Sequence, residues 1–302
     1  MVGVCLIAVF AIAAVAASSA SALPEWGKCV EQAGGKYLDG NCTTKGKGGT
    51  FEWKKGATQK NVKFTGKNVG SGGVLTTLPR VCVYEGSGHQ LTRAKCAEEG
   101  GPEAESTNTS PITIECESET NTGEQVGKNK VANISVKFLG CKVFGSAPCS
   151  NGPNEGEITV NTLKGELGYI NKASKEVGVL LQPVTKKGEF AKFNCAGILG
   201  TVVGVGNSKD GAQYLPESKG GNDGIISPIT PVNTMTSNFT QVFTVNAELA
   251  QNIPSKFENK PFKVLESYTF NIEEPQKKSQ WSAAGEEITN ENTAAEEGEI
   301  KA

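Results

Sequence analysis

The sequence predicts a mostly-β protein whose antiparallel sheets form a sandwich or a partly closed barrel, stabilised by disulfide bonds. Three observations indicate this fold. Many short segments alternate apolar and polar residues, the 302 residues include 37 glycines suited to tight turns, and nine cysteines are present. No repeat of fixed period occurs, which argues against a solenoid or a propeller.

Residues 1–22 have the features of a signal peptide. An uncharged apolar run fills most of this segment, and Ala20 and Ala22 give the small-x-small cleavage pattern, which predicts a mature chain that begins at Leu23. The apolar run is short and no stop-transfer segment follows it. We therefore expect a secreted, extracellular or cell-envelope protein without a stable membrane span after cleavage.

Cleavage would remove Cys5 and leave eight cysteines, an even number that is typical of disulfides in exported proteins. A zinc site is the alternative, but no C-x-x-C occurs and His89 is the only histidine. Eight cysteines allow 105 connectivities. Spacing favours three local pairs and one long-range pair, namely Cys29–Cys42, Cys82–Cys96, Cys141–Cys149 and Cys116–Cys195.

Residues 23–56 are expected to form a small β-hairpin module held by the Cys29–Cys42 bridge. Aromatic side chains on such a hairpin could stack against a sugar or a peptide, or they could form the small core of the module. The core is favoured, because a unit of this size has little else to bury. The four candidate binding residues are Trp26, Tyr37, Phe51 and Trp53.

Residues 57–110 are expected to form short strands followed by a polar linker. Val62 and Phe64 alternate with polar neighbours, and Val81 and Val83 flank Cys82 in a second short strand. Residues 97–110 contain Gly and Pro and lack any apolar period, which is typical of a long loop.

Residues 111–280 carry the clearest strand patterns and are expected to form the main antiparallel domain. One short helix is plausible at 247–252, and the acidic segment 281–302, with six Glu and one Lys, is expected to be disordered. The expected strands lie near 112–116, 134–138, 177–181, 193–195, 198–205, 225–229, 239–245 and 268–272.

Within this domain, residues 156–170 are predicted to form a hairpin with a two-residue turn at Lys164-Gly165. Opposed residues of a hairpin share one face of the sheet, so Glu157 and Glu166 would lie on the outer, solvated face. The inner face would carry Ile158, Val160, Leu167 and Tyr169.

The sequence identifies no catalytic residue. His89 lies in a polar Gly-Ser-Gly-His-Gln segment, which does not match the nucleophile elbow of a Ser-His-Asp hydrolase. A cysteine nucleophile needs an unpaired thiol, which the even count disfavours. A pair of carboxylates ~5–10 Å apart would serve a glycosidase, but sequence alone does not place such a pair.

No metal site, cofactor or nucleic-acid partner is expected. The loop around Asp210 and Asp223 does not fit the calcium-loop pattern, and the glycine-rich runs at 70–73 and 200–206 precede no helix that could hold a phosphate. The chain has a net charge of −2 and lacks the cluster of basic residues that nucleic-acid binding requires.

Several short sequence blocks lie within residues 24–205. They include Pro24–Cys29, Cys42-Thr43, Phe51–Trp53, Cys116–Ser118, Phe138–Cys141, Gly156–Ile158, Leu163–Ile170 and Phe193–Cys195. Together these blocks resemble a family of uncharacterised exported proteins of soil actinobacteria, which implies export from a bacterial cell but no activity and no functional residues. Residues 206–224 have no counterpart in this likeness.

From these features we expect an exported, disulfide-stabilised β protein that binds a ligand or associates with the cell envelope, and not an enzyme. Its expected partner is a cell-envelope component or an extracellular polysaccharide. The alternative is a secreted carboxylate-dependent hydrolase that acts on polysaccharide. A purely structural envelope protein without a ligand is a third hypothesis.

Overall fold

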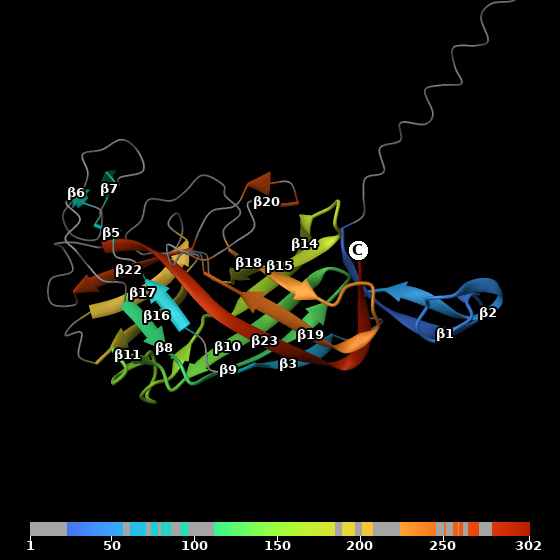
Figure 1. The fold of residues 1–302 in the computed structure, drawn as a ribbon, viewed down its shortest axis with the longest axis horizontal. Coiled ribbons are helices and arrows are strands. Elements are labelled where there is room, and N and C mark those ends of the chain that lie inside the picture. The colour runs from blue at the N-terminus through green and yellow to red at the C-terminus, as the bar shows by residue number, and fades with distance from the viewer. Residues whose placement is uncertain are drawn as a thin grey trace, which may run out of the picture.

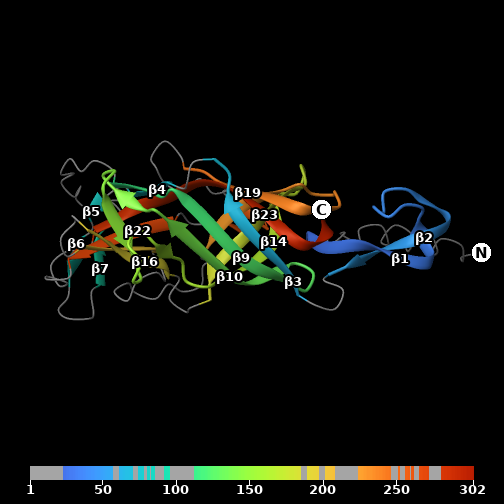
Figure 2. The same ribbon diagram turned by 90° about the horizontal axis from the view of Figure 1, so that it is seen from below.

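A computed structural model describes most of the chain after the expected signal peptide, and every structural statement below concerns the described residues. These are 23–56, 61–70, 74–77, 80–81, 83–85, 92–95, 112–184, 189–196, 201–207, 224–245, 251, 256–258, 260–261, 265–271 and 280–302. The molecule is elongated, with a β-hairpin projecting from one end (Figures 1 and 2).

The described residues contain strands and no helix, which confirms the predicted β class. The first half of the chain forms β1 (Glu25–Tyr37), β2 (Lys45–Lys55), β3 (Val62–Asn68), β4 (Val74–Thr77), β5 (Arg80–Val81), β6 (Val83–Glu85), β7 (Thr92–Lys95), β8 (Ile112–Glu115), β9 (Ser118–Val126), β10 (Lys130–Leu139), β11 (Lys142–Val143) and β12 (Ala147–Ser150). The second half forms β13 (Ile158–Thr159), β14 (Leu163–Asn171), β15 (Glu176–Pro183), β16 (Glu189–Cys195), β17 (Thr201–Asn207), β18 (Ile225–Thr230), β19 (Thr236–Phe243), β20 (Lys256–Phe257), β21 (Lys260–Pro261), β22 (Leu265–Asn271) and β23 (Gln280–Lys301).

Eight of these strands close into an antiparallel barrel, which decides between the two architectures that the sequence allowed. The pairings run β3–β9–β10–β14–β15–β18–β19–β23 and return from β23 to β3. A closed barrel has no unpaired edge, and a barrel of this strand number has room inside for side chains or one small ligand.

A second, curved sheet lies beside the barrel and shares β23 with it. It starts at the N-terminal part of β23, which pairs with β4, β5 and β22. From β4 the pairings continue through β8, β11, β12, β16 and β17 to β22. The long strand β23 therefore belongs to both sheets, and Figure 1 shows it running obliquely across the molecule.

The prediction that residues 281–302 are disordered is wrong, because they form nearly all of β23. This strand pairs with β1, β3, β4, β5, β19 and β22. The prediction treated the acidic residues as a sign of disorder, but Glu287 and Glu291 lie on the exposed face of the strand. The inward positions between them hold Ile288 and Asn290. Inward polar side chains hide the usual alternation of apolar and polar residues.

The predicted hairpin at 156–170 is also wrong in its pairing. Lys164 and Gly165 lie inside β14, which pairs with β15 across a turn at 172–175. Gly165 is needed for packing rather than for a turn, because a Cβ there would lie only 2.6 Å from a methyl of Val131 and 2.9 Å from a methyl of Val179. The apolar face was assigned correctly, since Ile158, Leu167 and Tyr169 are buried and Val160 packs against the core.

Three disulfides lie in the described residues, and they confirm one predicted pair and correct two. The confirmed pair is Cys29–Cys42. The predicted Cys141–Cys149 and Cys116–Cys195 pairs are wrong, because the bonds join Cys116 to Cys141 and Cys149 to Cys195. The predicted Cys82–Cys96 pair lies outside the described residues.

Strand register explains the two corrected disulfides. Cys149 and Cys195 are directly opposite each other where β12 pairs with β16. Glu115 of β8 pairs with Lys142 of β11 in an antiparallel register. Cys116 follows Glu115 and Cys141 precedes Lys142, so the two cysteines face each other at the next position of the register. Their Cα atoms are 3.9 Å apart in both bonds. Neighbours across strands, and not neighbours in sequence, therefore determine the pairing.

Most of the other expected strands are present within one to a few residues of their predicted bounds. They correspond to β3, β8, β10, β15, β16, β17, β18, β19 and β22. The polar linker at 97–110 and residues 247–250 and 252 of the predicted short helix lie outside the described residues, and Gln251 forms an isolated β-bridge with Val245.

Substitutions at neighbouring positions of β23 test whether this segment is a structural strand. Ile288 is buried, so Ile288→Ala should lower the free energy of unfolding by about 2–5 kcal/mol. Glu287 is exposed, so Glu287→Ala should change it by less than about 0.5 kcal/mol. Chemical denaturation followed by circular dichroism measures both values, and equal small effects would show that the segment contributes no core.

Candidate binding site inside the barrel

A cavity of about 120 Å³ lies among the inward-facing side chains of the barrel strands. Most of its wall is apolar, formed by aromatic and aliphatic side chains of the barrel strands, with Phe190 and Phe193 added from β16 of the second sheet. Most of these side chains also belong to the main hydrophobic core. A cavity with this mixture of aromatic and aliphatic residues is typical of small-molecule sites.

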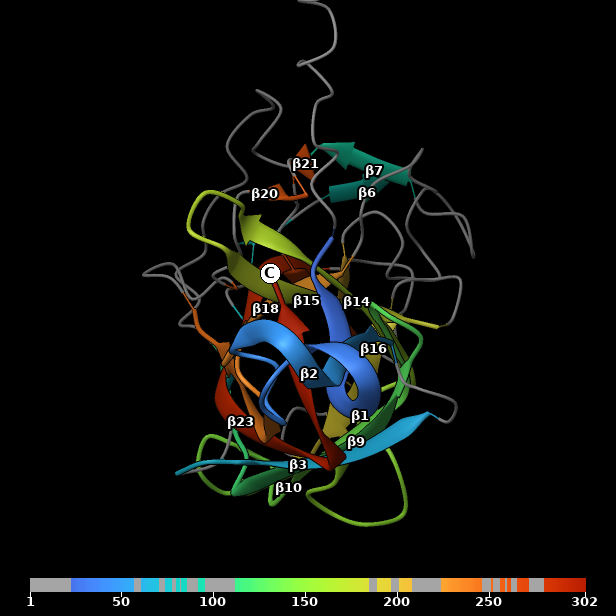
Figure 3. The same cartoon turned by 90° about the vertical axis from the view of Figure 1, so that its right-hand side faces the viewer.

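Trp26 contributes to the cavity from outside the barrel strands. It lies on β1 opposite Ile300, near the C-terminal end of β23, and its ring packs edge-on against Phe239 with the ring centroids 5.1 Å apart. Backbone hydrogen bonds from Trp26 N to Lys128 O and from Gly56 N to Trp26 O, both 2.6 Å, hold this position. Figure 3 shows the hairpin strands β1 and β2 in front of the barrel end.

One side of the cavity is polar, and we call it the polar stripe. The strand register explains how it forms, because Gly66 of β3 pairs with Asn121 of β9 on one side and with Asn292 of β23 on the other. A Cβ at Gly66 would collide with both carboxamides, so the missing side chain leaves room for them. The stripe comprises Asn121, Gln125, Gln241, Glu286, Asn290 and Asn292, with the buried Glu119 beside them.

Several acceptor atoms of the polar stripe have no hydrogen-bond partner in the part of the chain that the structure describes. Asn292 donates from Nδ2 to Gln241 Oε1 at 3.1 Å, but its own Oδ1 is buried without a donor. The Oδ1 atoms of Asn121 and Asn290 are also buried and without a partner. A buried polar atom without a partner costs about 1–3 kcal/mol, so this concentration of such atoms in one wall of a cavity requires a reason.

Glu119 is a fully buried carboxyl beside the polar stripe. The residue is 0% exposed, and neither carboxyl oxygen has a hydrogen-bond partner among the described residues. Its backbone N donates to Asn68 Oδ1 at 2.9 Å, which fixes the main chain at this position. Burial raises the pKa of Glu119 to about 7, and the nearby Asn121 carboxamide offsets only part of this effect.

Glu286 is the second carboxyl of this region, and it lines the cavity. Its backbone is held by the buried Gln251, whose Oε1 accepts from Glu286 N at 2.8 Å and whose Nε2 donates to Glu286 O at 3.3 Å and Thr244 O at 2.9 Å. Burial, followed by repulsion from Glu119, raises the pKa of Glu286 to about 8. The two carboxyls are therefore close enough to influence each other's protonation.

The four aromatic residues predicted as a binding platform are not brought together as an open surface. Trp26 is buried in the barrel end and Tyr37 is buried in the hairpin. Phe51 and Trp53 are partly buried, and the Lys301 ammonium lies 4.6 Å from the centroid of the Trp53 ring and 5.7 Å from that of Tyr37. The end of β23 thus covers part of this surface.

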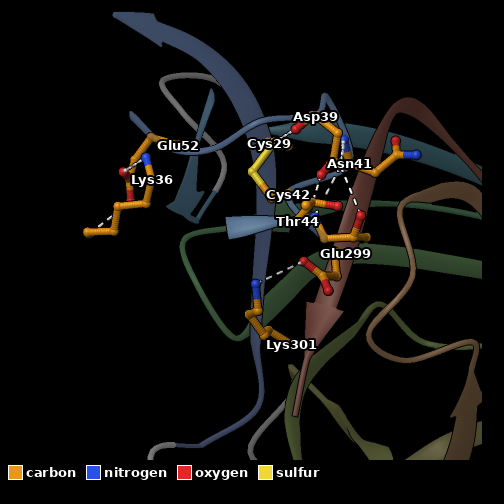
Figure 4. The surroundings of a disulfide bond; sticks show 10 residues. Cys29, Lys36, Asp39, Asn41, Cys42, Thr44, Glu52, Glu299 and Lys301 are labelled. Atoms are coloured by element: carbon orange, nitrogen blue, oxygen red, sulfur yellow. Dashed lines mark hydrogen bonds and ion pairs between the residues drawn. A yellow bond between two sulfur atoms is a disulfide. The ribbon is translucent and has the colours of Figure 1, made fainter. Parts of the chain in front are cut away.

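The hairpin loop is stabilised by the Cys29–Cys42 bond and by Asp39 (Figure 4). The Asp39 carboxylate accepts hydrogen bonds from the backbone N atoms of Asn41, Thr43 and Thr44 at 2.6–3.1 Å. These bonds, those from Thr43 and Thr44 above all, hold the pKa of Asp39 at about 2. This carboxylate has a structural role in a turn.

Of the other residues considered from the sequence, only Glu157 and Glu166 are described by the structure. Glu157 forms an ion pair with Lys137, and Glu166 accepts a hydrogen bond from Asn129, so both have ordinary partners. Among the described residues, no group of three or more His, Cys, Asp or Glu side chains is arranged to hold a metal ion. His89, Asp210 and Asp223 lie outside the described residues.

The residues of the polar stripe were missed by sequence reasoning, although a weak signal exists. Glu119 and Asn121 are separated by two positions, as are Asn290 and Asn292, so each pair must share one face of its strand. Polar residues at alternate positions are normally assigned to the solvent face. Only the closure of the barrel shows that these faces point inward.

Comparisons with known proteins add no further constraint. No family model matches the chain, and no curated protein or solved structure matches it. A search of the described part of the chain for a helix with the length and apolarity to cross a membrane found none.

The two raised pKa values predict that stability falls as pH rises from about 5 to 8. Unfolded carboxyls lose their protons near pH 4.5, whereas Glu119 and Glu286 keep theirs in the native state until about 7 and about 8. In this window the native state binds more protons, so the free energy of unfolding decreases with pH. One pKa unit equals about 1.4 kcal/mol, so the loss from Glu119 alone is about 3 kcal/mol.

Urea denaturation at several pH values between 4 and 9 measures this slope. The double variant Glu119→Gln, Glu286→Gln should have a flatter profile and should be more stable than the wild-type protein at pH 8. Glu287→Gln removes a carboxylate from the outer face of the same strand and should keep the wild-type profile. A double variant with an unchanged slope would contradict the assignment.

Proposed function

We propose that this chain is an exported, non-enzymatic binding protein that holds a small, mostly apolar molecule inside its closed β-barrel. The observation that supports this proposal best is the cavity of about 120 Å³, with aromatic and aliphatic residues on most of its wall and a stripe of polar groups on one side. Small-molecule sites combine a largely apolar lining with a few polar groups that orient the ligand.

The size of the cavity limits the ligand. An engineered cavity of about 150 Å³ lined by apolar residues binds benzene, so a cavity of this size accepts a molecule with one ring or a short chain. A volume of about 120 Å³ is too small to hold a segment of a polysaccharide chain. The expected polysaccharide partner is therefore not proposed for this cavity.

Export is proposed from two features. The three disulfides are consistent with an extracellular or oxidising environment. Residues 1–22 have the composition of a signal peptide, and the sequence blocks resemble exported actinobacterial proteins. Secretion or retention at the cell envelope of a bacterium would place the barrel where it can bind small molecules outside the cell.

The carboxylate-dependent hydrolase is retained as a second candidate because of one observation. Glu119 and Glu286 interact electrostatically, and both have raised pKa values that suit an acid or a base near neutral pH. Their position in a small and largely apolar cavity favours binding over attack on a polysaccharide. Release of reducing ends from a polysaccharide panel, abolished by Glu119→Gln or Glu286→Gln, would support the hydrolase instead.

A cavity-filling substitution tests the binding function. Ala294 and Ala295 are adjacent on β23, but Ala294 lines the cavity and Ala295 is exposed. We expect toluene and indole to raise the melting temperature of the wild-type protein and of Ala295→Leu. Ala294→Leu should bind them at least tenfold more weakly, because the added carbon atoms occupy the ligand volume.

Calorimetry and the fluorescence of Trp26, which lines the cavity, provide two independent readouts. Far-ultraviolet circular dichroism establishes that both variants are folded, and Ala191→Leu offers a second way to fill the cavity from β16. The absence of any stabilisation by toluene and indole in the wild-type protein, or equal binding by all three variants, would overturn the proposal.

A further inference from the structure

We infer that the polar stripe binds the ammonium group of a small apolar amine, whose ring or chain occupies the apolar part of the cavity. This inference rests on the proposed binding function and names the chemical class of the ligand. It follows from the kind of atoms that lack partners, from the charge of the cavity wall and from the arrangement of the two surfaces.

Among the described residues, the cavity lining has one unpartnered side-chain donor, Trp26 Nε1 on β1, whereas the unpartnered atoms of the polar stripe and of Glu119 are all acceptors. These acceptors are Oε1 and Oε2 of Glu119 and the Oδ1 atoms of Asn121, Asn290 and Asn292. Each of these residues is more than nine-tenths buried, and the three asparagines line the cavity. A ligand that completes this wall must therefore supply several hydrogen-bond donors in a small volume.

Rotation of the side chains does not remove this requirement. An asparagine carboxamide can exchange its oxygen and nitrogen by rotating, but an ionised carboxylate accepts through both oxygens in every rotamer. Glu119 therefore needs a donor or a proton whichever way its neighbours turn. Its 0% exposure means that bulk water does not provide the donor.

The charge of the wall selects a cation. The described residues that line the cavity include Glu286 but no Lys, Arg or His. Glu119 is buried two positions before the lining residue Asn121 on β9. An anionic ligand would find no positive partner in this lining and would be repelled by either carboxyl once it is ionised. A buried carboxylate is stabilised by an opposite charge with matching hydrogen bonds, which a ligand ammonium provides.

The number of donors favours an ammonium group over a hydroxyl group. An alcohol donates one hydrogen bond, whereas a primary ammonium donates three. Three donors match the acceptors clustered where β9, β3 and β23 lie side by side, since Asn121 and Asn292 approach each other over Gly66. The described acidic residues do not form a cluster suited to a metal ion.

The rest of the cavity fits the apolar part of such an amine. Phe64 and Phe239 lie on the two strands that flank β23, and both line the cavity near the asparagines. Phe239 pairs directly with Asn292 and Phe64 with Ala294. An amine with one aromatic ring, such as benzylamine, would thus place its ammonium on the polar stripe and its ring between aromatic side chains.

Three probes of the same shape test this inference: benzylamine, benzyl alcohol and toluene. Isothermal titration calorimetry with the mature protein at pH 7.5 should show that benzylamine binds about 10-fold to 100-fold more tightly than toluene, with benzyl alcohol between them. Glu119→Gln should remove most of the advantage of benzylamine and leave toluene binding within about twofold of the wild-type value.

Glu287→Gln is the matched control, because it removes an exposed carboxylate from the strand that carries Glu286. It should bind all three probes like the wild-type protein. Should Glu119→Gln fail to fold, the ranking of the three probes on the wild-type protein still decides the question.

The outcomes separate this inference from the proposed function. Equal binding of benzylamine and toluene would leave the binding function standing and overturn the ammonium site. Failure of all three probes to bind would overturn both. Displacement of benzylamine by millimolar Ca²⁺, together with tighter binding of Ca²⁺ than of any amine, would show a metal site in its place.

Discussion

The structure depends above all on the pairing of β23 with its neighbours. This single strand completes the barrel between β19 and β3, starts the second sheet through β4, β5 and β22, and anchors the hairpin through β1. Its buried Ile288, Ala294 and Ile300 supply core contacts on the inner face. Every sheet hydrogen bond at the seam of the barrel requires this strand, so the cavity exists only when the C-terminal segment is in place.

The same strand also explains why the barrel is not filled by apolar residues alone. Asn290 and Asn292 face inward beside Ile288, and they meet Asn121 across Gly66. Burying amide and carboxyl groups without partners lowers stability, and a protein selected only for stability would place apolar residues there. We therefore propose that a ligand supplies the missing donors of the polar stripe. The same unpartnered acceptors that lower the stability of the ligand-free protein would then recognise the ligand.

Much of the fold could be predicted from short-range pattern. Alternation identified the strands around Ile114, Ile134, Val179 and Phe193, and the 29–42 disulfide followed from a spacing that suits one hairpin. The other two described disulfides could not be predicted, because Cys149 meets Cys195 only through the pairing of β12 with β16. The site could not be predicted either, because the local sequence pattern around Glu119 and Asn290 is the same as that of polar residues on a solvated strand face.

By itself the sequence determined the β class and most strand positions, because these depend on period-two patterning and on composition within a few residues. The tertiary structure decided that the sheet closes, that an acidic C-terminal segment is its central strand, and that Lys164-Gly165 continues a strand instead of turning. It also decided which face of β9 and β23 is inside. The physical reason is that strand register joins residues far apart in sequence, and a one-residue change of register would turn every side chain to the opposite face.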